Sequence, residues 1–182
     1  MICDYLGLVT ILFCHKLELQ RGMVDLKFEV STRIDRPVRE VFEAVADPAR
    51  LSGYFTTGGA VGRLETGATV QWAFSEFPDS FPVEVVEVVQ DQRIVLRWAA
   101  SEGPPEGPDQ VTDAGYSTTV TMTFQPLDEG SRTLVRIAEE GWRQTPAGLQ
   151  ASYGNCMGWS QMLSALKARV EYDINLRDGA YR

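Results

Sequence analysis

Histidine and cysteine are scarce in this sequence of 182 residues: His15 is the only histidine, and the cysteines are Cys3, Cys14 and Cys156. Because His15 lies before the expected folded domain, that domain cannot contain a Ser-His-Asp triad or a Cys-His pair. The cysteine spacings match no zinc site, and an odd, sparse count gives no disulfide framework, which favours a reducing, cytoplasmic location. The chain also lacks a glycine-rich phosphate loop and an H-E-x-x-H motif. We therefore expect no metal and no cofactor, and we assign no catalytic residues.

Positive charge is also in short supply. The chain carries 17 Lys and Arg against 25 Asp and Glu, a net charge of -8. Phosphate binding needs clustered Lys and Arg, so this balance argues against a nucleic-acid or anionic-membrane partner. Apolar residues, in contrast, make up 44% of the chain and charged residues 23%. This composition is that of a soluble domain with enough apolar mass to bury a core, and it excludes disorder of the whole chain.

The first 22 residues differ from the rest of the chain. Their apolar run, Tyr5–Phe13, has nine residues, which is too short for a membrane span of about 20 residues. A secretory signal would place positive charge before the run and small residues after it, and neither is present. We expect either that Met23 is the natural start and residues 1–22 are an upstream extension, or that Leu6–Phe13 forms an added edge strand or an interface segment.

Apolar residues alternate from residue 24 onward, which predicts a strand that ends at Asp35-Arg36-Pro37. Apolar residues at helical spacing from Val38 to Val45 then predict a short helix, and a second short helix begins at Pro48. The alternation slips by one residue at Val85-Val86, which predicts a β-bulge. Residues 101–115 are rich in Gly, Pro and acid and form either a hairpin connection or a lid. Further strands are predicted over residues 70–74, 81–88, 94–98, 116–124 and 131–140.

The apolar period becomes helical near the C-terminus. Thr145-Pro146 is a helix start, with Thr as N-cap and Pro in the first turn, and the spacing extends this helix to about Tyr172. Gly154 and Gly158 lie inside it and are each unfavourable by about 1 kcal/mol relative to Ala. We interpret them as allowing a close approach to the sheet or a local bulge. The folded domain is expected over residues 23–174, followed by a frayed tail, 175–182.

One strand, two short helices, a run of antiparallel strands and a long final helix make an α+β domain. Five segments of the sequence carry a family resemblance: I-x-R-P-V-x-x-V-F-x-A-V-A-D-P-A-R-L (Ile34–Leu51), the hairpin around Gly67, V-E-V-V-x-D-Q-R-I-V-L-R-W (Val86–Trp98), T-V-T-M-T-F (Thr119–Phe124) and G-W-S-Q-M-L-S-A-L (Gly158–Leu166). In their order and spacing they resemble the helix-grip superfamily, also called START-like or SRPBCC. Within it they resemble the family named for the activator of heat-shock protein 90 ATPase.

The resemblance implies a curved antiparallel sheet wrapped around the long C-terminal helix, with a hydrophobic cavity between them. The family often has a Trp shortly after its D-P-x-x-L segment, where this chain has Tyr54-Phe55. An aromatic residue is retained there, so the fold expectation stands, but the mouth of the cavity differs. The resemblance does not by itself imply binding to heat-shock protein 90.

Large aromatic and sulfur-containing residues fall on the inward faces of the expected strands and helix. Each is either part of a packed core or part of the wall of a ligand cavity. The residues that we assign to ligand binding, including two tyrosines that could orient a ligand, are Tyr54, Trp72, Phe74, Trp98, Met122, Phe124, Tyr153, Cys156, Trp159 and Met162.

Other polar residues are candidates for ligand contact or for surface positions. Arg97 and Tyr116 could orient a ligand, although each is also a normal surface or hydrogen-bonded residue. Glu139-Glu140 lies before Gly141-Trp142 and reads as a solvated turn. The alternative is a carboxylate at the cavity mouth, with a raised pKa and an acid or base role. Cys156 reads as a small buried apolar group, because no basic residue is nearby in the sequence.

Three functions are compatible with these features. The first is a binding module, not an enzyme, that holds a small hydrophobic or amphipathic ligand between the sheet and the helix. The second is an enzyme of the cyclase or hydratase type, using Tyr and carboxylates at the cavity mouth. The third is a chaperone-linked or other protein-interaction module with an exposed apolar patch. A homodimer is compatible with all three.

Overall fold

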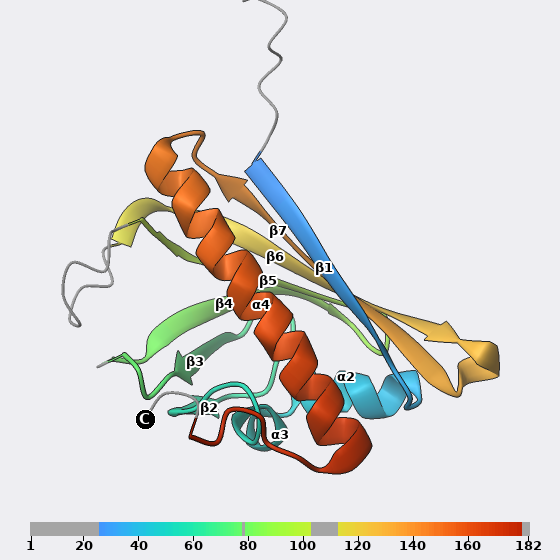
Figure 1. Ribbon diagram of the computed structural model, residues 1–182. Helices are drawn as coiled ribbons and strands as arrows, with labels where there is room; N and C mark the ends of the chain where they lie inside the picture. The colour runs from blue at the N-terminus through green and yellow to red at the C-terminus, as the bar shows by residue number, and fades with distance from the viewer. Residues whose placement is uncertain (1–25, 78, 103–112, 180–182) are drawn as a thin grey trace, which may run out of the picture.

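The computed structural model describes residues 26–77, 79–102 and 113–179. Within them a seven-stranded antiparallel sheet in the order β1-β7-β6-β5-β4-β3-β2 has the long helix α4 across one face (Figure 1). The strands are β1 Leu26–Ile34, β2 Gly59–Val61, β3 Thr69–Ala73, β4 Phe81–Val89, β5 Arg93–Ser101, β6 Asp113–Leu127 and β7 Arg132–Trp142. The helices are α2 Val38–Ala46, α3 Pro48–Ser52, the 3-10 turn η1 Asp128–Gly130 and α4 Pro146–Tyr172. The α+β helix-grip prediction is confirmed, including both short helices after the first strand.

The long helix begins and ends where the sequence predicts. Thr145 Oγ1 accepts a hydrogen bond of 3.0 Å from the Gly148 N–H, and Pro146 occupies the first turn. At the other end Asp173 adopts a left-handed conformation (φ 58°), and its N–H bonds back to the carbonyl groups of Ala168 and Arg169. Both caps are local, and this is why the sequence alone defines this helix well.

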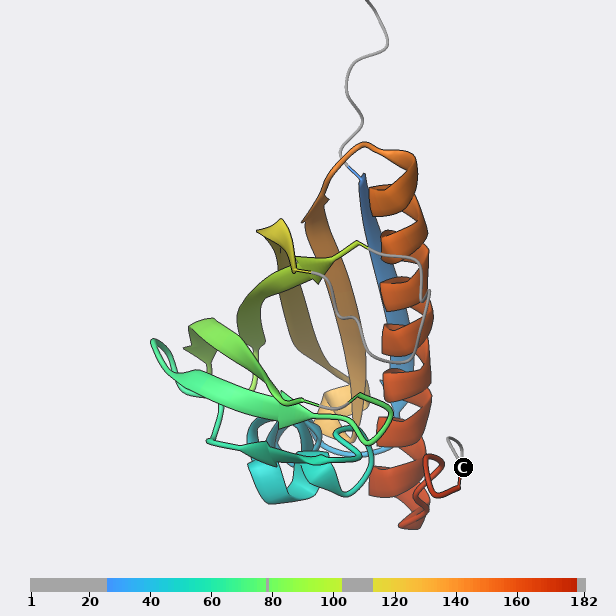
Figure 2. The ribbon, with the colours of Figure 1, turned by 90° about the vertical axis from the view of Figure 1, so that its left-hand side faces the viewer.

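The sheet is strongly curved. In Figure 2, β1 runs alongside α4, whereas β3 and β4 run across the direction of the helix near its C-terminal end. The pairing of β4 with β5 shifts between Val85 and Glu87, which confirms the predicted β-bulge. A bulge bends and twists its strand, so this one helps to turn the sheet toward the helix. The short strand β2 was not expected, because its glycines read as loop.

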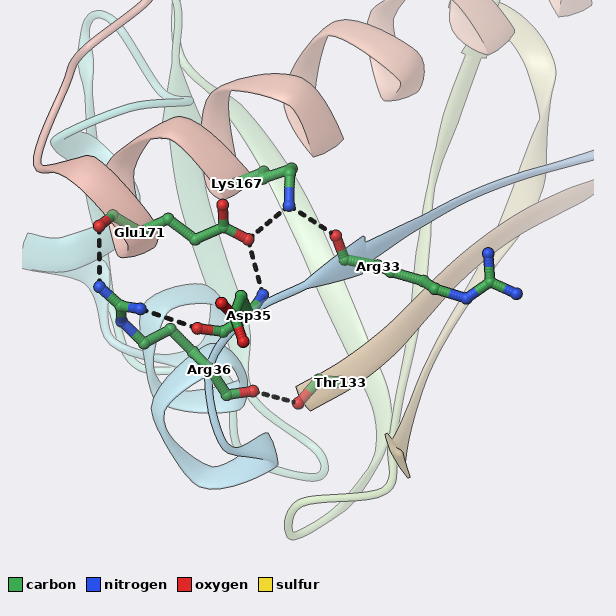
Figure 3. A network of polar contacts seen from close by, with 6 residues as sticks. All are labelled: Arg33, Asp35, Arg36, Thr133, Lys167 and Glu171. Carbon is green, nitrogen blue, oxygen red and sulfur yellow. Dashed lines mark hydrogen bonds and ion pairs between the residues drawn. The ribbon is translucent and has the colours of Figure 1, made fainter. Parts of the chain in front are cut away.

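A network of polar contacts, which we call the C-terminal clamp (Arg33, Asp35, Arg36, Lys167 and Glu171), ties α4 to the turn between β1 and α2 (Figure 3). Glu171 accepts hydrogen bonds from the Asp35 N–H (2.6 Å) and from Lys167 Nζ (2.5 Å). Lys167 also donates to the Arg33 carbonyl, and Arg36 to the Glu171 carbonyl. Burial opposes ionisation of Glu171, but these donors outweigh it, so its pKa lies below the ordinary value.

The glycines of α4 differ from the prediction. A Cβ at Gly154 or Gly158 would meet nothing within 4 Å, so neither residue permits a close approach to the sheet. The close approach occurs instead at Gly148, where a Cβ would lie 2.2 Å from the Arg143 carbonyl oxygen. Periodicity places a glycine on a helix, but only the fold reveals which glycine faces a neighbour.

One residue of the predicted tail 175–182 contacts the domain. Arg177 is largely buried, and its guanidinium pairs with Glu76 at 2.6 Å. The segment after α4 therefore returns to the domain, up to residue 179 where the described residues end. The predicted extension 1–22 and most of the predicted loop 101–115 lie outside the described residues.

Candidate functional site

A buried glutamate is the central polar group between the sheet and α4. Glu139 lies on β7 and points inward with Val135 and Ile137, and it is 0% exposed. Three side chains donate hydrogen bonds to its carboxyl group. They are Trp98 Nε1 on Oε1 (3.0 Å), Thr118 Oγ1 on Oε1 (2.7 Å) and Trp159 Nε1 on Oε2 (2.9 Å). Four elements, β5, β6, β7 and α4, thus converge on one carboxyl group.

The interpretation of Glu139-Glu140 as a solvated turn is wrong. β7 continues to Trp142 through Gly141, and Glu139 pairs with Val120 of β6 inside the sheet. Glu140 is exposed, as the alternation of a strand requires for the next residue. The sheet therefore carries one acidic residue into the core and leaves its neighbour in solvent.

Electrostatically, Glu139 has no compensating cation among the described residues. Burial raises its pKa, the hydrogen bonds from Thr118, Trp159 and Trp98 lower it, and the net shift is upward. No charged side chain of the described residues contributes to this shift. A buried carboxyl held by donors but without a counter-ion is costly, and such groups are candidates for functional sites.

Trp98 is the centre of the rings around this carboxyl group. It stacks on Trp159 with ring centroids 5.4 Å apart and an interplanar angle of 18°. Its other contacts are edge-to-face, with Trp72 and with Phe81, both at 5.9 Å. Rings from β3, β4, β5 and α4 therefore meet above Glu139.

Phe55, in the segment after α3, extends this group of rings. It stacks on Trp159 at 5.6 Å and makes edge contacts with Trp72 at 5.6 Å and with Phe74 at 5.1 Å. We call the connected set the aromatic cluster, and its members are Phe55, Trp72, Phe74, Phe81, Trp98 and Trp159.

The aromatic cluster has a buried side and an open side. Phe55, Trp72 and Trp159 are buried, whereas Phe74, Phe81 and Trp98 are partly exposed. A cation of the chain lies over one buried and one partly exposed ring of the cluster: the Arg177 guanidinium is 5.8 Å from the centroid of Phe55 and 5.5 Å from that of Phe74. These distances are within the range of a cation–π interaction.

Two of the predicted ligand-binding residues lie elsewhere in the core. Tyr54 is 1% exposed and donates its hydroxyl to the Ala44 carbonyl at 3.2 Å, and burial raises the pKa of this phenol. Phe124 packs edge-on against Phe42 of α2 at 5.2 Å. Both residues are accounted for by packing against α2, away from Glu139.

The remaining predicted residues are divided between core and surface. Met122 and Met162 are at most 1% exposed and belong to the main hydrophobic core. Tyr153 is 61% exposed on α4, and Cys156 is a partly exposed free thiol on the same helix. The structure therefore brings Trp72, Phe74, Trp98 and Trp159 together and leaves these four outside the aromatic cluster.

The polar candidates of β5 and β6 do not meet Glu139. Arg97 lies on the outer face and is 3.5 Å from Glu84. The Tyr116 hydroxyl donates to Glu102 at 2.5 Å, and the Arg143 guanidinium lies 4.4 Å from the centroid of its ring. Burial and the Glu102 hydrogen bond raise the pKa of Tyr116. Through Tyr116, these two contacts connect the residue after β5 with the segment that precedes α4.

Sequence reasoning missed Phe55, Phe81 and Thr118 as site residues. The alternation of the strands could have identified two of them. Phe81 begins an alternating strand, and Thr118 lies on the same inward face of its strand as Met122. Phe55 lies in an irregular segment, where no period indicates the direction of a side chain.

Comparison with known proteins agrees with this geometry. A family model described as "Activator of Hsp90 ATPase homolog 1-like protein" matches residues 35–171. The chain belongs to this family. The family lies within the START-like (SRPBCC) helix-grip superfamily, so the resemblance read from the sequence is confirmed. No curated protein matches the chain.

Solved structures share the fold of this family member at low sequence identity. Protein SSP2350 from Staphylococcus saprophyticus is 23% identical, with a TM-score of 0.66 over 84% of this chain and 96% of that one. Protein MLL2253 from Mesorhizobium loti is 20% identical, with a TM-score of 0.64 over 83% and 100%. The Aha1 dimer from Colwellia psychrerythraea is 16% identical, with a TM-score of 0.60 over 81% and 97%. At these identities the likeness is one of fold.

Two kinds of feature are not found in the part of the chain that the structure describes. No three His, Cys, Asp or Glu side chains gather as a metal site would require. No helix there has both the length and the apolar character needed to span a membrane.

Proposed function

We propose that this protein binds a small hydrophobic or amphipathic molecule between the sheet and α4, without catalysing a reaction. The observation that carries the proposal is Trp98, a large ring on the inward face of a central strand that remains partly exposed. Aromatic side chains bury large areas in a core, and Trp is highly buried on average although rarely completely so. A ligand seated on the open side of the aromatic cluster would bury what Trp98, Phe74 and Phe81 leave accessible.

The surroundings of Trp98 also suit a binding site. Binding sites combine predominantly apolar walls with a few fixed polar groups. Here Glu139 is the polar group, and three donors hold both of its oxygens in place. A preorganised site of this kind lowers the entropic cost of binding, because the side chains need little ordering when the ligand arrives.

Titration with Nile red, a neutral polarity-sensitive dye, tests the proposal. We expect a saturable, blue-shifted fluorescence signal, and Trp98→Ala should weaken the apparent affinity by tenfold or more. Trp142→Phe is the matched control, since Trp142 is buried but makes no ring contact with the aromatic cluster among the described residues. A linear, non-saturating signal, or equal effects of the two substitutions, would overturn the proposal.

Glu139 also gives some support to a cyclase- or hydratase-type enzyme, because a raised pKa suits a general acid. Such a reaction needs a second titratable group near the same substrate atom. The side chains that the structure places on Glu139 are Thr118, Trp98 and Trp159, none of which titrates near neutral pH. Native mass spectrometry decides between the two: a co-purified molecule of unchanged mass after incubation supports binding, and a change in mass supports catalysis.

A further inference from the structure

The chemistry of the ligand's polar end can be inferred from the surroundings of Glu139, beside the aromatic cluster. Glu139 is enclosed by hydrogen-bond donors, yet no Lys or Arg of the described residues balances its charge. Much of the desolvation penalty of a buried carboxylate is therefore already met when the protein folds. A positively charged ligand would gain Coulomb attraction to Glu139. Desolvation of the carboxylate would not oppose its binding a second time, because it has already taken place on folding.

The carboxyl group has hydrogen-bonding capacity for one more donor. Each carboxylate oxygen offers two lone pairs. Oε1 accepts from both Trp98 and Thr118, whereas Oε2 accepts from Trp159 alone among the residues that the structure describes. An additional N–H donor can therefore bind Oε2 while the three existing bonds persist.

The walls of the site also favour a cation. The faces of aromatic rings carry partial negative charge, and indole is the strongest cation–π partner. Trp98 and Trp159 direct their indole N–H edges at Glu139 and stack on one another, and Phe55 stacks on Trp159, so the ring faces that a cation could use lie outside the carboxyl group itself. Two rings of the aromatic cluster already contact a cation of the chain, because the Arg177 guanidinium lies over Phe55 and Phe74. A ligand carboxylate, in contrast, would be repelled by the like charge of Glu139.

We propose that the ligand is an amphipathic amine, whose ammonium group binds Glu139 and whose apolar body packs on the aromatic cluster. The inference rests on the proposed function and adds the chemistry of the head group. Trp98 controls entry, since it is the partly exposed donor of the three that hold the carboxyl group. A neutral alcohol would fit the walls but leave the charge of Glu139 unbalanced.

Displacement of Nile red from the full chain by decylamine, decanol and decanoate tests this inference at pH 7 and 150 mM salt. Decylamine is protonated at this pH, as a lysine side chain is. We expect it to displace the dye at a concentration at least tenfold below those of decanol and decanoate, because a hydrogen bond between charged groups supplies about that margin. The Glu139→Gln variant should reduce this preference to less than threefold.

Glu140→Gln is the matched control, because it removes the same charge from the exposed neighbouring residue. It should keep the preference for the amine. If decanol or decanoate competes as well as decylamine, or if Glu139→Gln keeps the preference, the ammonium inference is wrong and the binding function stands. If Nile red itself does not bind saturably, the proposed function fails first. Should Glu139→Gln not fold, the wild-type comparison of the three probes decides alone.

Discussion

The indole N–H of Trp159 in α4 donates a hydrogen bond of 2.9 Å to Oε2 of Glu139 in β7, so the helix and the sheet share a polar contact inside the core. Such a bond is directional, unlike the apolar contacts around it, so it favours one rotation of α4 about its own axis. It also positions the Trp159 ring against Trp98 and Phe55. Packing of the aromatic cluster therefore depends on a carboxyl group.

Trp159→Phe should destabilise the protein by about 1–3 kcal/mol beyond any packing loss, because Oε2 of Glu139 would lose its only donor among the described residues. Urea unfolding measures the change. Trp142→Phe is the comparison: Trp142 is also buried, but its Nε1 has no hydrogen-bond partner in the part of the chain described. Equal losses for the two variants would mean that the hydrogen bond to Glu139 contributes nothing.

The stability of the protein should depend on the protonation of Glu139. Its pKa in the folded state is raised above 4.5, so the folded state binds more protons than the unfolded state at pH values above 4.5. Its contribution to stability is therefore complete below pH 4.5 and is lost as the pH rises through the folded pKa. The unfolding free energy of the wild type, minus that of Glu139→Gln, should fall as the pH is raised from 4.5.

Urea unfolding at pH values from 4.5 to 8 measures this difference. Tyr116 of the neighbouring strand β6, whose pKa is raised, is present in both proteins, so its titration cancels from the difference. A difference that is flat or that rises with pH would contradict the prediction.

Glu171 in the C-terminal clamp should show the opposite pH dependence. Its pKa is held below the ordinary 4.5, so its contribution is present above pH 4.5 and is lost as the pH falls through the folded value. Glu171→Gln should lower the unfolding free energy at pH 7 by about 1–3 kcal/mol and flatten the acid limb of the stability curve. Glu40→Gln is the control, since its ion pair with Arg36 is at the surface and worth little. A loss as large in the control would show that the contacts of the clamp are not responsible.

Alanine substitutions in α4 should have opposite effects at two glycines. Gly154→Ala should stabilise the protein by about 0.5–1 kcal/mol, because a Cβ there meets open space and Ala favours a helix. Gly148→Ala should destabilise it, because its Cβ would lie 2.2 Å from the Arg143 carbonyl oxygen. Thermal unfolding of the two variants under the same conditions compares them. Stabilisation by Gly148→Ala would disprove the tight contact at the start of α4.

Local signals explain what the sequence predicts correctly. The Thr145-Pro146 cap and the helical period define α4, and the one-residue slip at Val85-Val86 marks the bulge in β4. Each of these features depends on residues that are close together in the chain. The same holds for Pro48, where the predicted second short helix begins.

The features that sequence reasoning missed depend on distant residues. Glu139 resembles part of a turn because Glu-Glu-Gly follows a strand, but pairing with Val120 of β6 carries the strand onward. Arg177 resembles part of a tail, but its partner Glu76 is 101 residues away in the chain. Most of the predicted aromatic residues were correctly placed inside, while their division between the core and the aromatic cluster depends on how the sheet curves.

Two of the four tryptophans, Trp98 and Trp159, donate their indole N–H groups to the same carboxyl group. Loss of a proton from Glu139, or binding of a ligand beside it, must alter the electric field at both indole rings. The intrinsic tryptophan fluorescence of the protein should therefore change with the protonation of Glu139 and with ligand binding beside it, without an added label.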